Sequence, residues 1–401
     1  MIQSILKYLE EIFEETVTIR RYFHQHPELS FEEENTPKKI AEILSELGIQ
    51  TRVGVGGRGV VGVIEGKLPG KTVALRADFD ALAIQDEKEV EYKSKVPGKM
   101  HACGHDGHTA ALLSVAKALQ HHRDQLKGRV VLIHQFAEEI TPGGALPMIE
   151  DGCLDGVDAI FGTHLWSSLP TGQVGFRSGP IMAAVDKFSV EIQGRGGHGA
   201  QPHLTRDPIL LATNYVQMLQ QIVSRNINPL SSAVISVCSF HSGSAFNVIP
   251  DQAQLTGTVR TFAPAVQDFI SQQMEKTLKS VCESSGASYT FTYEKGYPAV
   301  VNHEEETTFA MKCAKDIVGE EHVIEMEPSM GGEDFAYYLR RVPGTFFFTG
   351  AGNTEKGANY PHHHPKFDID ETAMLHAAKI LALTAVQYLE EHAQEITPTN
   401  S

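Results

Sequence analysis

The chain has 401 residues, of which 41% are hydrophobic and 21% are charged, values that are typical of globular proteins. The length exceeds that of one ordinary hydrophobic core, so we expect two domains. The net charge of −16 argues against sequence-independent binding to nucleic acid and against an anionic membrane surface, but it allows a local basic pocket for an anionic substrate.

The cysteines and the N-terminus indicate the compartment. Five cysteines lie at positions 103, 153, 238, 282 and 313 without a CxxC pair, which is typical of a reducing environment rather than of a disulfide framework. The first residues are acidic and carry no basic region of a signal peptide, and no apolar run approaches the ~18 residues of a membrane span. We therefore expect a cytoplasmic protein that does not enter the membrane.

The N-terminal region begins with helices and continues with short strands. Apolar residues at helical spacing predict one helix over residues 1–26, which ends before Pro27, and a second helix from Thr36 to Leu47. Three short strands are expected at 51–53, 60–64 and 72–76.

Three buried apolar strands are each followed by side chains that can take part in chemistry. The strand 72–76 leads into Asp78 and Asp80, the strand 130–136 into Glu138 and Glu139, and the strand 157–162 into His164. In α/β proteins sites form at the carboxyl ends of strands, so we expect these groups to converge. The alternative for the aspartates is a pair of turn residues. Of two adjacent glutamates, one can bind a metal while the other stays free for proton transfer.

Residues 100–108, Met-His-Ala-Cys-Gly-His-Asp-Gly-His, concentrate ligand-type side chains. Gly104 separates Cys103 from His105, so a tight loop can aim both side chains at one point. A thiolate and an imidazole are ligands that Zn²⁺ prefers. The alternatives are a loop that is merely rich in histidine and a buried structural cysteine. His101 and His108 are expected to belong to the loop or to the surroundings of the ligands.

The pattern changes between residues 183 and 293. The predicted order is β-α-β-β-α-β, which indicates a small antiparallel sheet with two helices on one face. A helix, a buried strand at 344–349 and a final helix from Asp370 to about His392 follow. We therefore expect one domain from residues 1–182 and 294–401, interrupted by an inserted domain at 183–293.

Eight separated motifs resemble, in order and spacing, those of the M20-type metallopeptidases: RADFDAL, MHACGHDGH, FAEE, GTHLW, GGHGAQPH, NVIPD, MGGEDF and PHHHPKF. The chain is most similar to the amidohydrolase branch, which contains N-acyl-amino-acid amidohydrolases, hippurate hydrolases, N-acetyl-diaminopimelate deacetylases and auxin-conjugate hydrolases. The resemblance implies an α/β, zinc-exopeptidase-like catalytic domain with a mixed sheet flanked by helices. It also implies an inserted ferredoxin-like lid and dimerisation domain, and hence a homodimer or higher homo-oligomer.

The resemblance implies a set of metal ligands, matched one position at a time. Cys103 matches a ligand that bridges two metals, where other M20 enzymes have an aspartate; the other matches are His105, Glu139, His164 and one histidine of the triplet His362, His363 and His364. Alignment on Pro365 and Phe367 favours His363. The implied cofactor is a divalent metal, with two ions per subunit, chosen among Zn²⁺, Mn²⁺, Co²⁺ and Ni²⁺.

Further roles follow from the same resemblance. Glu138 matches the general base, Asp78 stands where relatives have the histidine of a His-x-Asp motif, and Asp80 resembles the carboxylate that orients a ligand. His198 matches the histidine that polarises the scissile carbonyl, which several relatives supply from the partner subunit. Asn247 and Arg260 match residues near the substrate. Glu333 and Asp334 belong to a motif of the branch, and their role does not follow from the sequence.

The expected reaction is metal-dependent hydrolysis of N-acyl amino acids to a carboxylic acid and a free amino acid. The first alternative is a dipeptidase on the same scaffold. A non-catalytic metal- or ligand-binding protein is disfavoured because both Glu138 and Glu139 are present. A thiol or redox enzyme is disfavoured because no second cysteine lies near Cys103 in the sequence.

Overall fold

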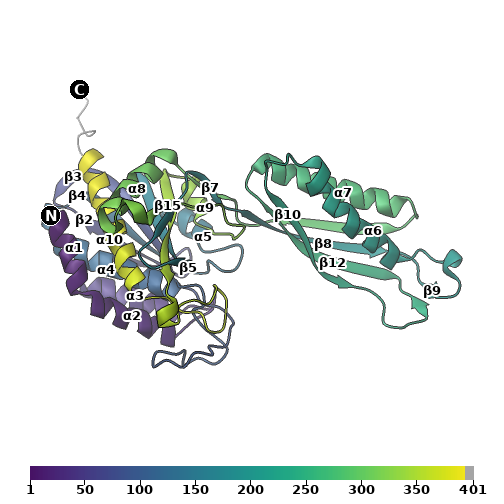
Figure 1. Cartoon of the computed structure of the whole chain (residues 1–401), viewed down its shortest axis with the longest axis horizontal. Helices are drawn as coiled ribbons and strands as arrows, with labels where there is room; N and C mark the ends of the chain where they lie inside the picture. Colours follow the sequence, from purple (N-terminus) through teal and green to yellow (C-terminus); the bar gives the residue numbers. More distant parts are fainter. Residues whose placement is uncertain (393–401) are drawn as a thin grey trace, which may run out of the picture. The chain divides into compact units, whose positions relative to one another are not determined.

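A computed structural model describes residues 1–392 and divides the chain into two compact units, each drawn in Figure 1. Unit 1 comprises residues 1–181, 300–327 and the segment from 334, and unit 2 comprises residues 182–299 and 328–333. The segment 328–333 was not expected in the inserted domain. It joins unit 2 because the backbone N–H of Ala183 donates to the carbonyls of Ser329 and Gly331, both at 3.0 Å.

Unit 1 is built on an eight-stranded mixed sheet with the order β1-β2-β4-β3-β5-β16-β6-β15. The strands are β1 (Gln50–Val55), β2 (Gly59–Glu65), β3 (Leu68–Asp78), β4 (Lys127–Gln135), β5 (Ala159–Pro170), β6 (Val174–Phe176), β15 (Val323–Glu325) and β16 (Gly344–Gly352). The four central strands β4, β3, β5 and β16 are parallel, so their carboxyl ends lie at one edge of the sheet. The predicted α/β class with a mixed sheet is confirmed.

Helices cover this sheet. They are α1 (Ile2–Glu11), α2 (Phe13–Gln25), α3 (Asn35–Glu46), α4 (His105–His121), α5 (Ala145–Glu150), α8 (Glu304–Val318), α9 (Ala336–Leu339) and α10 (Thr372–Glu391). Both α4 and α10 pack against β3, and almost every residue of α4 from His105 to Leu119 is buried. The prediction of one helix over residues 1–26 is wrong, because Ile12 leaves helical geometry (ψ 7°) and divides the segment into α1 and α2.

Unit 2 is a four-stranded antiparallel sheet with the order β10-β12-β8-β13. Its strands are β8 (Ala184–Gln193), β10 (Ala233–His241), β12 (Gln252–Thr261) and β13 (Ser288–Lys295). The helices α6 (Pro208–Gln221) and α7 (Pro264–Glu283) lie on one face, as Figure 1 shows. Residues along β8 and β12 alternate between buried and more exposed, as expected for strands with one covered face.

Smaller elements complete the description. The strands β9 (Gly197–His198) and β11 (Val248–Ile249) pair at one end of unit 2, and β7 (Gly179–Met182) and β14 (Val300–Asn302) flank that unit in the sequence. No helix within residues 1–392 is both long and apolar enough to cross a membrane.

Candidate metal centre

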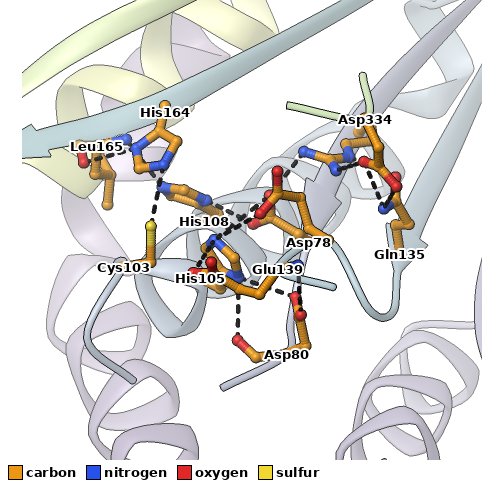
Figure 2. A network of polar contacts seen from close by, with 12 residues as sticks. Asp78, Asp80, Cys103, His105, His108, Gln135, Glu139, His164, Leu165 and Asp334 are labelled. Carbon is orange, nitrogen blue, oxygen red and sulfur yellow. Dashed lines mark hydrogen bonds and ion pairs between the residues drawn. The ribbon is translucent and has the colours of Figure 1, made fainter. Parts of the chain in front are cut away.

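The side chains that follow the central strands of unit 1 lie together (Figure 2). One ligand atom from each of Cys103, His105 and Glu139 lies within 4.8 Å of the others. The Sγ of Cys103 is 3.5 Å from the Nε2 of His164. The Nε2 of His105 is 3.9 Å from Glu138. Three chain segments that are far apart in the sequence therefore supply one cluster, at the edge of the sheet where parallel strands end.

The loop before α4 positions the thiol and the first imidazole. Gly104 has a φ of +95°, a left-handed conformation that side-chain-bearing residues rarely adopt, and α4 begins at the next residue. His105 therefore stands in the first turn of a buried helix, while Cys103 is held just before it. The tight glycine turn expected from the sequence is present.

Asp80 orients two other members of the cluster. One of its oxygens, Oδ1, accepts a hydrogen bond from the Nδ1 of His105 at 3.0 Å, and Oδ2 accepts from the backbone N–H of Glu139 at 3.0 Å and from Ser30 at 2.7 Å. Donation from Nδ1 fixes the tautomer of His105 and leaves Nε2 as the nitrogen that can bind a metal. Asp80 thus contacts two members of the cluster, and the orienting role that the family resemblance implies for it stays a prediction.

The two adjacent glutamates follow β4 closely, after a residue with left-handed backbone geometry. Ala137 has a φ of +49°, and its N–H donates to Glu33 at 2.9 Å. Both Glu138 and Glu139 follow this left-handed residue and approach His105, at 3.9 Å and 3.8 Å from its Nε2. Sequence reasoning missed Glu33, because nothing in its local pattern marks it as a partner of a turn a hundred residues later.

His164 lies inside a strand rather than after it. The predicted strand ended at residue 162, but β5 continues to Pro170 because β16 pairs with it, with Phe348 opposite His164. Pairing with β3 stops earlier, at Gly162. His164 therefore stands just beyond the last residue of β5 that pairs with β3, on a strand that is still held on its other side.

The histidine triplet divides into three different environments. The ring of His364 stacks on Tyr360, and its Nδ1 accepts from the backbone N–H of Lys366. His362 lies within 4.8 Å of Cys103 and His164, but its Nε2 already accepts the N–H of Ser167 at 3.2 Å. The Nε2 of His363 lies 3.4 Å from Glu139. The triplet thus brings two imidazoles to the cluster, His362 beside Cys103 and His164, and His363 beside Glu139.

Asp78 is engaged differently from Asp80. Its Oδ2 accepts from Arg76 at 2.7 Å and its Oδ1 accepts from His108 at 2.6 Å. Arg76 also donates to Asp334 at 2.8 Å, and Asp334 in turn accepts from Gln135 and from the backbone of Ala145. An ion pair and an imidazole thus hold the Asp78 carboxylate, and its place among the catalytic residues stays a prediction. The role of Asp334 that the sequence left open is to hold Arg76, β4 and α5 together.

The charge balance of the cluster fits a cation. Burial, followed by the nearby carboxylates of Glu139 and Glu138, raises the pKa of the Cys103 thiol well above its usual range. Burial opposes the charged form of His105, but Asp78 and Asp80 outweigh it and raise its pKa to about 10. The metal-free cluster thus holds protons on a thiol and an imidazole, where bound cations would stabilise their deprotonated forms.

Two buried atoms also fit a metal. The Nε2 of His105 and the Oε1 of Glu139 are inaccessible to solvent and have no hydrogen-bond partner among residues 1–392. Buried polar atoms without a partner are costly, and a divalent ion would satisfy both. The donor set of thiolate, imidazole and carboxylate suits borderline metals.

Two of the residues predicted near the substrate belong to the β9–β11 end of unit 2. His198 is exposed and pairs with Val248, and its Nδ1 accepts from the N–H of Ala200 at 3.0 Å. The carbonyl of the adjacent Asn247 accepts from Gly199 at 2.8 Å. His198 and Asn247 are therefore neighbours on exposed backbone turns.

Arg260 lies at the other end of the same sheet. It stands opposite Val185, near the start of β8, whereas the β9–β11 pair follows the end of β8 at Gln193. Eight residues of strand correspond to about 27 Å. The structure therefore does not bring Arg260 together with Asn247 within one chain, and the expected place of each near the substrate stays a prediction. Arg260 donates instead to the carbonyl of Met330 at 3.2 Å.

The family of the chain follows from its sequence and from this site. Residues 74–387 match the model of a protein family that is described as peptidase family M20/M25/M40. The chain belongs to this family. The predicted resemblance is thereby confirmed.

Individual relatives cover nearly the same length. The protein YhaA of Bacillus subtilis (strain 168), whose name contains the term amidohydrolase, is 58% identical over 96% of this chain and 98% of its own. The N-acyl-L-amino acid amidohydrolase of Geobacillus stearothermophilus is 45% identical over 76% of this chain and 82% of its own. The crystal structure of the Bacillus subtilis YXEP protein, described as a dinuclear metal binding peptidase, is 37% identical, with a TM-score of 0.82 over 95% of this chain and 99% of that one.

Proposed function

We propose that the protein is a metal-dependent amidohydrolase that cleaves the amide bond of N-acyl amino acids. The observation that carries this proposal is the pairing of a buried thiol–imidazole–carboxylate cluster with an additional carboxylate, Glu138, at 3.9 Å from His105. The similarity to the N-acyl-L-amino acid amidohydrolase supports the substrate class. The products would be a carboxylic acid and a free amino acid.

Cys103, His105, Glu139, His164 and His363 are the proposed ligands that would hold the divalent ions. His363 is preferred over His362 for a reason of protonation. Because the Nε2 of His362 accepts a backbone N–H, its other nitrogen carries the proton of the neutral ring and offers no lone pair. The Nε2 of His363 points instead to Glu139, another proposed ligand. Zn²⁺, Mn²⁺, Co²⁺ and Ni²⁺ all suit this set.

The chain's own residues would carry the proton transfers. When bound, the divalent ions supply Lewis acidity toward water and toward the scissile carbonyl. Glu138, which is not needed as a ligand, accepts the proton of the attacking water and returns it to the departing amine. Asp80 keeps His105 in its metal-binding tautomer throughout, since its carboxylate is bound to Nδ1.

Unit 2 is proposed to act as a ferredoxin-like lid and dimerisation domain of a cytoplasmic homodimer. Its βαββαβ order and its exposed His198 support this role. His198 would donate to the developing oxyanion, and Asn247 beside it would contact the substrate. Arg260 would contact the substrate separately, from the other end of the sheet.

A peptidase acting on dipeptides is the second candidate, because the family and the YXEP protein are both described as peptidases. A hydrolysis screen separates the two. Purified protein, reconstituted with each of the four metals, is assayed for release of amino acids from acetyl-, benzoyl- and longer acyl-amino acids and from dipeptides. Faster cleavage of acyl amino acids than of every dipeptide supports the proposal, and the opposite order supports the peptidase. Metal binding without any hydrolysis would indicate a non-catalytic protein.

A further inference from the structure

A continuous path of hydrogen bonds leads from Asp334 to the proposed ligand His164 (Figure 2). Asp334 accepts from Arg76 at 2.8 Å, and Arg76 donates to Asp78 at 2.7 Å. Asp78 accepts from the Nδ1 of His108 at 2.6 Å. Every side chain on this path is buried, so each contact is shielded from water and specific in direction.

The path continues through a backbone group. The N–H of Leu165 donates to the Nε2 of His108 at 2.9 Å, and the carbonyl of Leu165 accepts from the Nδ1 of His164 at 2.9 Å. The Nε2 of His164 is thereby left as an acceptor, and it is this atom that lies 3.5 Å from the Sγ of Cys103. The residue after the ligand thus fixes the tautomer of the ligand.

The sheet explains why a side chain is needed here. The strand β3 pairs with β5 only as far as Gly162, so the N–H groups of β5 beyond that point lack a strand partner on this side. A buried N–H without an acceptor is costly. His108 supplies the missing acceptor for Leu165, one turn into α4 from the ligand His105.

The two hydrogen bonds of His108 also determine which of its ring nitrogens carries the proton. Its Nε2 accepts an N–H and therefore carries no proton, while its Nδ1 donates to the carboxylate of Asp78. Both nitrogens are occupied, so His108 has no lone pair for a metal even though it lies within 4.8 Å of Asp78 and His105. It is an orienting group rather than a ligand.

We propose that His108, oriented by Asp78, is a positioning residue that holds the Leu165 peptide and thereby sets the metal affinity of His164. This inference rests on the assignment of His164 as a ligand in the proposed function. Partners of this kind orient ligands in other metal sites, where their loss typically weakens metal binding about 10- to 100-fold.

Two substitutions separate the two hydrogen bonds of His108. In His108→Asn the amide reaches the position of Nδ1, so contact with Asp78 is retained and the acceptor for Leu165 is lost. In His108→Gln the amide oxygen reaches the position of Nε2, so the acceptor for Leu165 is retained. His122→Gln is the matched control, because His122 is also buried, lies at the other end of α4 and makes two hydrogen bonds, to Ser4 and to Ala118. Fourteen helical residues place it about 21 Å from His108.

The test is a Co²⁺ titration of the full-length protein against a competing chelator, with the thiolate-to-cobalt absorption as a second signal. His108→Asn is expected to weaken binding at least ~10-fold and to alter the absorption, whereas His108→Gln stays within ~3-fold of the wild type and His122→Gln is unchanged. Unchanged affinity and absorption in His108→Asn overturn the proposal.

The experiment also distinguishes a folding defect of His108→Asn from a wrong assignment of His164 as a ligand. If His108→Asn does not fold, His108→Gln decides: wild-type affinity supports the proposal, and a large loss contradicts it, because the acceptor is retained. His164→Ala tests the underlying assignment separately. If that variant binds as many ions as the wild type, the ligand set is wrong, whereas a lost ion in His164→Ala with normal binding in His108→Asn overturns the positioning role alone.

Discussion

The two units differ most clearly in how they use histidine. Unit 1 buries seven histidines: His24, His101, His105, His108, His122, His134 and His164. The three histidines of unit 2, at positions 198, 203 and 241, are all exposed. Six of the seven buried imidazoles of unit 1 have a hydrogen-bond partner within the unit, which restricts their tautomers, whereas both ring nitrogens of His101 have none among residues 1–392. The exposed His198 accepts the N–H of Ala200 at Nδ1, so a substrate or another subunit would be met by its Nε2.

The same contrast holds for buried carboxylates. In unit 1, Asp78 and Asp80 accept from Arg76 and from two histidines that surround the cluster. In unit 2, Asp186 is equally buried but accepts hydrogen bonds from the uncharged side chains of Gln267 and Tyr293. These contacts hold the fold of unit 2 together and involve no histidine. We infer that metal binding depends on unit 1 alone, while turnover requires both units. Substitutions in the two units should therefore separate metal content from activity.

The largest effect is expected for Glu138→Gln. Loss of the proton acceptor should lower turnover about 10³-fold, while the bound metal remains, because Glu138 is not a proposed ligand. Elemental analysis and amino-acid release are measured on the same sample, with Glu139→Gln as the control that should lose metal. An active Glu138→Gln enzyme would show that the general base has been assigned to the wrong residue.

His198→Ala should lower kcat about 10²-fold and leave the metal content unchanged, because it removes a donor to the oxyanion and touches no ligand. His203→Ala, an exposed histidine of the same unit, serves as control. Loss of metal in His198→Ala would contradict the separation of the two units.

Mixing subunits of His198→Ala with those of Glu138→Gln sharpens this result. If His198 acts on the site of the partner in a symmetric dimer, half of the mixed population is heterodimeric with one complete site, so about a quarter of the wild-type activity returns. If His198 acts within its own chain, no activity returns. The unmixed variants give the baseline.

Cys103→Ala should reduce metal affinity about 10- to 100-fold, by analogy with the loss of supporting groups in other sites, and should lower the number of bound ions. Cys153→Ala is the matched control, since Cys153 is buried in the same unit but belongs to no ligand cluster. Unchanged stoichiometry in Cys103→Ala would exclude a bridging thiolate.

The smallest expected effect concerns acid stability. Burial lowers the pKa of His134 to about 3, whereas an unfolded histidine titrates near 6.5. Between these pH values the unfolded chain binds a proton that the folded chain does not, so stability falls as the pH is lowered through this window. His134→Gln should reduce this dependence by about one proton, or about 1.4 kcal/mol per pH unit. Denaturant unfolding of metal-free protein at several pH values measures it, and an unchanged slope would contradict it.

The sequence predicts the parts of the site that follow local patterns. Strand ends, the glycine turn at Gly104 and the adjacent glutamates are all visible in the sequence, because hydrophobic periodicity and turn chemistry are local. The family resemblance added His363 and His198. The end of β5 was not predictable from the sequence, since the strand continues past residue 162 only because β16 pairs with it.

Residues that act through distant partners were also missed. His108 was expected in the loop or in the surroundings of the ligands, but its partners were not visible. The importance of Arg76 was not visible either, because its partner Asp334 is 258 positions away in the sequence. The separation of Arg260 from Asn247 depends on strand register, which no local pattern of residues specifies.

Metal removal and restoration on the wild-type protein tests the central claim most directly. The protein is dialysed against a chelator, and the release of amino acid from an N-acyl amino acid is followed as a divalent metal is added back in known equivalents. We expect no hydrolysis by the metal-free protein and full activity at about two ions per chain, in line with the proposed ligand set. Hydrolysis that continues undiminished in the metal-free protein would contradict the account.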